Sequence, residues 1–116
     1  MKVYGIKNCD TVKKALTWLE KNRIPYEFHD YKKLGISPQK LEEWSAQLGW
    51  DRLLNKRGTT WKKLDPDTQN SIRTKEDAFM LMQEKTSIIK RPLIEDANNL
   101  LLGFDEAEYT NLLIKQ

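Results

Sequence analysis

Cys9 is the only cysteine of the chain, and its position makes it the first candidate for chemistry. It stands between residues 2–6, which are predicted to form a strand, and a helix predicted from Asp10 onward. Backbone N–H groups at a helix N-terminus stabilise an anion. They therefore favour the thiolate of a cysteine placed there, and the thiolate is the nucleophilic form. A free cysteine is more often a small buried apolar residue, but this placement favours a reactive thiol.

The neighbours of Cys9 are polar, as a reactive thiol requires. Asn8 and Thr11 flank it, and Lys13 adds a positive charge one helical turn later on the same face. Asp10 opposes a thiolate unless its carboxylate points away or caps the helix. We therefore take Asn8, Thr11 and Lys13 as candidate substrate-binding residues around Cys9.

Two basic positions elsewhere could also contribute to chemistry. Arg91 precedes Pro92, and a residue before proline is held extended. A cis bond at this position would be a deliberate feature of the fold; the alternative is a strand-start proline beside an exposed arginine. Lys56 and Arg57 lie in the polar loop 55–61, where the alternative to anion binding is a pair of solvated charges.

The single histidine and the tryptophans point to structure more than to chemistry. His29 falls on a predicted strand, on the face opposite Phe28, which favours a half-exposed structural role. Trp18 and Trp44 have the spacing of core residues. Trp61, in the polar loop, is the tryptophan best placed to line a cleft.

Hydrophobic periodicity predicts the elements that position these residues. Strand 2–6, a helix from Asp10 and a strand over 25–31 make a strand–helix–strand unit, which predicts a parallel pair. Further elements are predicted from caps and apolar runs: helices over 38–48, from 66 and over 74–82, strand character at 88–89, a hairpin of 93–94 with 100–102 around the turn 96–99, and a final helix from 105 through 113. The order predicts an α/β fold with a mixed sheet and a helical insertion.

Composition limits the function classes. The net charge of +3 is spread along the chain, which is too mild to indicate direct nucleic-acid binding but helps to attract small anions such as glutathione or an oxyanion. One cysteine excludes an internal disulfide and a multi-cysteine zinc site. Without a signal peptide or an apolar run near the roughly 20 residues of a membrane span, we expect no membrane partner and a cytoplasmic location.

Three blocks of sequence resemble a known family. Residues 5–15 (GIKNCDTVKKA), 53–61 (LLNKRGTTW) and 88–94 (IIKRPLI) are similar to blocks of the arsenate reductase-like family, which includes the Spx regulators, and to its YffB-like branch. The resemblance implies one arsenate reductase-like domain over 1–116. It also implies a thioredoxin-like fold with a four-stranded sheet, its core at about 1–31 and 87–116, and a helical insert at about 32–86.

The resemblance also implies roles for particular residues. Cys9 matches the family nucleophile, which attacks arsenate and is resolved by glutathione. Arg91 matches an oxyanion-binding arginine with Pro92 beside it, and Arg57 lies in the block that supplies another family arginine. Glutathione is thus the expected co-substrate, with no bound cofactor and no metal.

Two departures from the family pattern favour a different substrate. Arsenate reductases carry a histidine where this chain has Gly5, and a third arginine where it has Gly103. Fewer positive charges weaken oxyanion turnover. We therefore expect a glutathione-dependent monothiol reductase acting on an oxidised thiol or a small oxyanion. The alternatives are a true arsenate reductase, or an Spx-like regulator binding RNA polymerase, although Val12 occupies the second cysteine position of many Spx proteins.

Overall fold

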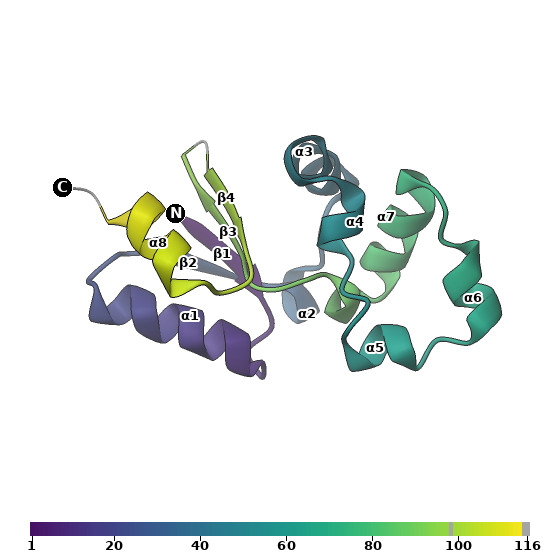
Figure 1. The fold of residues 1–116 in the computed structure, drawn as a ribbon, viewed down its shortest axis with the longest axis horizontal. Coiled ribbons are helices and arrows are strands. Elements are labelled where there is room, and N and C mark those ends of the chain that lie inside the picture. Colours follow the sequence, from purple (N-terminus) through teal and green to yellow (C-terminus); the bar gives the residue numbers. More distant parts are fainter. Residues whose placement is uncertain (98, 115–116) are drawn as a thin grey trace. The chain divides into compact units, whose positions relative to one another are not determined.

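The computed structural model describes residues 1–97 and 99–114. The chain divides into two compact units, which are described separately below. The first combines Met1–Tyr31 with Arg91–Gln116, and the second is Lys32–Lys90. The first contains the sheet, and the second is helical (Figure 1).

A mixed four-stranded sheet forms the first unit, in the order β2-β1-β3-β4 (Figure 1). The strands are β1 Lys2–Gly5, β2 Glu27–Asp30, β3 Leu93–Asp96 and β4 Asn99–Leu102. β1 and β2 are parallel, whereas β1 with β3 and β3 with β4 are antiparallel. The predicted parallel pair and the predicted hairpin are confirmed; Asn98, in the predicted turn, lies outside the described residues.

Two helices, α1 (Asp10–Lys21) and α8 (Glu106–Leu113), pack on one face of this sheet. α1 buries an apolar stripe at the predicted helical spacing, and Asp105 caps α8 by accepting a hydrogen bond from the Glu108 N–H at 3.1 Å. Burial of this stripe is the main stabilising term for such a helix. The shared core comprises Val3, Ala15, Trp18, Leu19, Ile94, Leu101, Tyr109 and Leu113.

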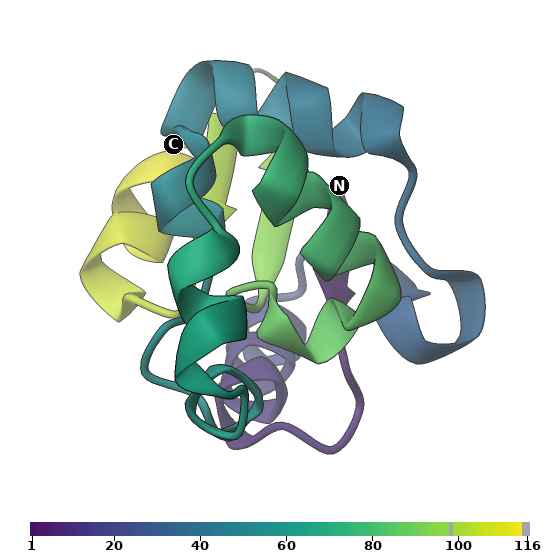
Figure 2. The ribbon, with the colours of Figure 1, turned by 90° about the vertical axis from the view of Figure 1, so that its right-hand side faces the viewer.

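The second unit is built from short helices around α3 and α7 (Figure 2). Its elements after α2 (Tyr31–Leu34) are α3 Pro38–Leu48, α4 Trp50–Leu53, α5 Thr59–Lys62, α6 Pro66–Ser71, α7 Lys75–Glu84 and the 3-10 helix Thr86–Ile88. The predicted caps are present: Ser37 accepts from the Lys40 N–H, and Thr74 with Asp77 forms a capping box. An ion pair of 2.8 Å joins Lys75 on α7 to Glu42 on α3.

Two predictions about the second unit are wrong. Residues 88–89 were expected to be a strand, but Thr86–Ile88 is a 3-10 helix and Ile89 makes only an isolated bridge to Leu54. Ile88 and Ile89 are both buried, as residues of an interior strand are. The bridge to Leu54 is isolated, however, and does not extend into a strand. The loop 55–61 also contains the start of α5, a helix of 4 residues that is too short for periodicity to reveal.

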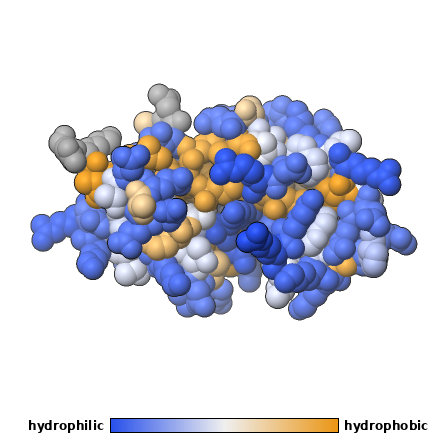
Figure 3. All heavy atoms as spheres, viewed as in Figure 1, coloured by the Kyte–Doolittle hydropathy of each residue, from blue (hydrophilic) through white to orange (hydrophobic). Residues whose placement is uncertain are grey.

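The face of the molecule seen in Figure 3 is mostly hydrophilic. None of the helices in the described part of the chain is long and apolar enough to cross a membrane. Apolar side chains are instead concentrated in the interior, where they account for nearly all of the buried residues.

Candidate active site

Strand register brings three chain segments to one edge of the sheet. Tyr4 near the end of β1 pairs with Leu93 at the start of β3, and Leu93 pairs with Leu102 at the end of β4. The segment after β1, the segment before β3 and the segment after β4 therefore emerge at the same edge. These segments contain Cys9, Arg91 with Pro92, and Gly103.

Cys9 is the N-cap residue of α1, with an extended backbone at φ −133° and ψ 122°. Its carbonyl accepts the Lys13 N–H at 2.9 Å, and its thiol is half-exposed. Cys9 makes no side-chain cap hydrogen bond. As the N-cap residue it lies at the N-terminal end of α1, where negative charge is stabilised. The other polar residues predicted around it are solvent-exposed: Asn8, Asp10, Thr11 and Lys13.

The Arg91–Pro92 peptide bond is cis. Pro92 is buried, and its carbonyl accepts the Gly103 N–H at 2.8 Å. Arg91 is only partly exposed, and its Nε is buried. The expected alternative of an exposed arginine is therefore wrong, because part of the Arg91 guanidinium group is buried.

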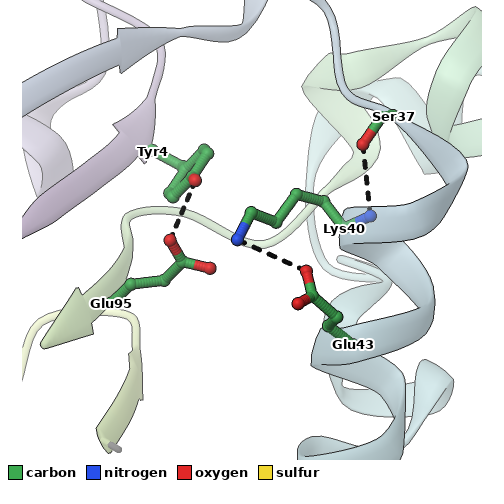
Figure 4. Close-up of polar contacts among 5 residues, drawn as sticks. All are labelled: Tyr4, Ser37, Lys40, Glu43 and Glu95. Atoms are coloured by element: carbon green, nitrogen blue, oxygen red, sulfur yellow. Dashed lines mark hydrogen bonds and ion pairs between the residues drawn. The ribbon is translucent and has the colours of Figure 1, made fainter. Parts of the chain in front are cut away.

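A group of aromatic residues lies on the sheet face opposite α1 and α8. The ring centroids of Tyr4 and His29 are 4.7 Å apart, and that of Tyr31 is 5.9 Å from His29. The Tyr4 hydroxyl donates to Glu95 Oε1 at 2.9 Å (Figure 4). His29 thus packs among aromatic rings, in keeping with a structural role. Sequence alternation separated His29 from Phe28 but gave no sign of this grouping.

Tyr31 links this aromatic group to Arg91. Burial raises the pKa of Tyr31, and Tyr4 and Glu95 raise it further, whereas the Arg91 guanidinium opposes them. The Tyr31 hydroxyl is buried and has no hydrogen-bond partner among the described residues. It therefore stays protonated, and the charge of Arg91 lies within electrostatic reach of it.

Gly5 has no room for a larger residue. A Cβ built on Gly5 would lie 2.9 Å from Val12 Cγ2 and 3.7 Å from Phe28 Cε1. α1 therefore approaches β1 too closely for the histidine that arsenate reductases have at this position. The glycine that this chain has in place of the family histidine is thus required by the packing of α1 on β1.

Replacing Gly5 by alanine should destabilise the protein by about 1–3 kcal/mol, as overpacking of a core does. The measurement is the free energy of unfolding in urea. The matched control is the double variant Gly5→Ala with Val12→Ala, in which the clashing methyl groups are gone. The alanine at position 5 should be better tolerated in the Val12→Ala background than in the wild type; an equal loss in both would contradict the close contact.

Gly103 is likewise fixed as glycine by its backbone. Its φ of +82° lies in the region that favours glycine. An arginine here, as in arsenate reductases, would strain the backbone. The local backbone conformation therefore accounts for glycine in place of the third arginine. Gly103→Arg would disturb the loop as well as add a charge.

Arg57 belongs to the second unit, whereas Cys9, Arg91 and Pro92 belong to the first. Its side chain is exposed, and its N–H donates to Asn55 Oδ1 at 3.2 Å. Lys56 Nζ lies 5.5 Å from the ring centroid of Trp61, which is half-buried. Over the described residues, no cluster of three or more His, Cys, Asp or Glu side chains is arranged to hold a metal.

Comparison with known proteins identifies the family. The model of the ArsC family matches residues 4–112. An uncharacterised protein of Haemophilus influenzae is 48% identical over 107 residues, covering 92% of this chain and 93% of its own length. The global transcriptional regulator Spx of Streptococcus pneumoniae is 29% identical over 103 residues, covering 87% of this chain and 76% of its own length.

Solved structures agree in fold. The YffB protein superposes with a TM-score of 0.92 at 42% identity, covering 97% of this chain and 98% of its own. An arsenate reductase (ArsC) related protein from Brucella melitensis gives 0.75 at 42% identity, covering 96% and 92%. The α/β, thioredoxin-like fold expected from the sequence is thus confirmed. Its mixed sheet, its Cys9 turn and these comparisons together show that the chain belongs to the ArsC family, with a YffB-like sequence and structure.

Proposed function

We propose that this protein is a glutathione-dependent monothiol reductase with Cys9 as its nucleophile. The observation that carries the proposal is the position of Cys9 at the N-cap of α1, on the same sheet edge as Arg91 and Pro92. The chain has no second cysteine, so a thiol of another molecule must resolve any adduct, and glutathione is proposed for this role. This chemistry needs a pool of reduced thiol, which the cytoplasm supplies.

The proposed reaction has two thiol–disulfide exchange steps. The Cys9 thiolate attacks the glutathione sulfur of a mixed disulfide; the substrate sulfur leaves as a thiolate and takes up a proton. Cys9 is then joined to glutathione. The thiolate of a second glutathione attacks the glutathione sulfur of this adduct, which releases oxidised glutathione and restores the Cys9 thiolate. In the net reaction the mixed disulfide and one reduced glutathione give the free substrate thiol and oxidised glutathione, and Cys9 is returned unchanged.

Residues at the same sheet edge would bind the glutathione part. The Arg91 guanidinium would pair with a glutathione carboxylate, since such a pair can be bidentate. Asn8, Thr11 and Lys13, which neighbour Cys9 in the chain, would contribute polar groups and one positive charge to binding, and Pro92, which adjoins Arg91, would also take part in binding. Arg57, in the second unit, is proposed as a further anion-binding residue.

Mass spectrometry of the purified protein after incubation with oxidised glutathione tests this proposal. We expect one glutathione adduct on Cys9 and its removal by reduced glutathione. The matched control is Cys9→Ser, which should stay unmodified. Wild-type protein that stays unmodified under conditions in which free thiols exchange would rule out the proposed chemistry.

Arsenate reduction should be weak or absent. The family histidine is replaced by Gly5, which has no space for a side chain, and the third arginine by Gly103, whose backbone favours glycine. With less positive charge, the transition state of oxyanion reduction is less stabilised. The measurement is arsenite formation with reduced glutathione; turnover comparable to that of an arsenate reductase would contradict the importance given to these two positions.

A second candidate function is supported by the Spx relative, whose similarity covers 87% of this chain. In this alternative the protein binds RNA polymerase and performs no thiol chemistry. The second cysteine position holds Val12, and Cys9 is the only cysteine of the chain, so an internal disulfide cannot act as the trigger. Polymerase that co-purifies equally with wild type and Cys9→Ser, together with absent glutathionylation, would favour the regulator.

A further inference from the structure

Two hydrogen bonds connect α8 to the segment that precedes β3. The buried Tyr109 hydroxyl donates to the Gly103 carbonyl at 2.6 Å. The Gly103 N–H donates to the Pro92 carbonyl at 2.8 Å. The peptide groups on both sides of the Gly103 Cα are therefore held, one by Tyr109 and the other by Pro92.

Tyr109 is a rigid anchor for this connection. It is 0% exposed, and its ring makes edge contacts with Trp18 and Phe104, at centroid distances of 5.4 and 5.0 Å. Burial raises the pKa of Tyr109, and the nearby Glu108 carboxylate raises it further. The phenol therefore remains a neutral donor, and rotation of its ring is restricted by packing.

Gly103 is the residue of this connection with the greatest intrinsic backbone freedom. Its φ of +82° gives the chain a sharp change of direction after β4, and no side chain restricts it. A glycine has many accessible backbone conformations. A hydrogen bond to its carbonyl therefore restricts the backbone more at this position than it would at another residue type. Pro92, directly linked to Arg91, is the group that this restraint reaches.

We propose that the Tyr109 hydroxyl is a positioning group for the active-site edge: it fixes Gly103, and Gly103 fixes Pro92 and the start of the Arg91 side chain. The proposal rests on the proposed function, in which Arg91 binds a carboxylate of glutathione. Tyr109 does not touch the substrate in this account. Its effect is transmitted through one side-chain-to-backbone hydrogen bond and one backbone hydrogen bond, both within the first unit.

The test compares Tyr109→Phe with the wild type in two reactions of Cys9. Alkylation by iodoacetamide needs only the thiolate, whereas reaction with oxidised glutathione also needs Arg91 in place. Loss of one neutral hydrogen bond should slow the glutathione reaction by about three- to tenfold and leave alkylation unchanged. A purely structural role for Tyr109 would not change the ratio of the two rates.

Tyr26→Phe is the matched control. The Tyr26 hydroxyl also makes a single hydrogen bond, to Glu20 Oε1 at 3.0 Å, in the same unit. Tyr26 precedes Glu27, which pairs with Lys2 at the start of β1, so it lies at the opposite edge of the sheet. Both Cys9 reactions should proceed in this variant as in the wild type.

Hydrogen exchange of the Gly103 amide, followed by NMR, separates this inference from the proposed function. In Tyr109→Phe that amide should exchange on the order of tenfold faster, while the Val3 amide in β1 is unaffected. Unchanged exchange at Gly103, or an unchanged ratio of the two Cys9 rates, would overturn the positioning role. A wild type that fails to react with oxidised glutathione overturns the proposed function, and with it the role of Tyr109 in that reaction; the exchange result still decides whether Tyr109 restrains the loop.

Discussion

Replacing Cys9 by serine is expected to abolish the reaction with oxidised glutathione. No other cysteine can take its place, and a serine hydroxyl does not exchange with a disulfide. The measurement is the rate of adduct formation, which should fall below detection in Cys9→Ser. Because the side chain is half-exposed and makes no cap hydrogen bond, the free energy of unfolding should change by less than about 0.5 kcal/mol.

Cys9→Ala provides the control for this substitution. It removes the thiol without adding a hydroxyl, so it should be as inert as Cys9→Ser. A serine at the N-cap can itself accept a helix N–H, so the serine variant should be the more stable of the two. Residual glutathione incorporation in either variant would show that the chemistry does not depend on Cys9.

Replacing Arg91 by alanine is expected to slow glutathionylation of Cys9 by roughly ten- to a hundredfold. A positioned cation bonded to a charged partner contributes about 1.5–3 kcal/mol, and each 1.4 kcal/mol is about a factor of ten in rate. Arg57→Ala should have the smaller effect, because the Arg57 side chain is exposed in a polar loop. The measurement is the second-order rate constant with oxidised glutathione for the three proteins.

Arg91→Lys is needed beside Arg91→Ala, because Arg91 is not a simple surface residue. Its Nε is buried and its charge acts on Tyr31, so truncation should also lower the melting temperature. Lysine keeps the charge and loses the planar fork of the guanidinium, and its rate should fall between those of arginine and alanine. Equal rates in wild type, Arg57→Ala and Arg91→Ala would mean that neither arginine recognises glutathione.

The features that the sequence could predict are those with local signals. α1 was predictable because its apolar residues recur at helical spacing, and α3, α7 and α8 because Ser37, Thr74 and Asp105 are good caps. The parallel pair followed from the strand–helix–strand order. The same reasoning placed Cys9 at a strand-to-helix turn, where the structure has it.

The features that it could not predict depend on contacts between residues far apart in the chain. Nothing local shows that Arg91 is partly buried near Tyr31, or that the Tyr109 hydroxyl reaches Gly103. The positive φ of Gly103 and the missing space at Gly5 are also tertiary properties, although both concern glycines that the sequence had marked as departures. The four-residue helices α4 and α5 could not be predicted, because a single helical turn is too short to show a hydrophobic periodicity.

Catalytic turnover is the measurement that tests the central claim most directly. Purified protein is added to a mixed disulfide of glutathione and a small thiol, with reduced glutathione in excess, and the formation of oxidised glutathione is followed. The account predicts many turnovers per protein molecule, a rate that rises with reduced glutathione, and a rate for Cys9→Ser equal to that without protein. A wild-type rate equal to the uncatalysed rate would contradict it and leave the polymerase-binding alternative ahead.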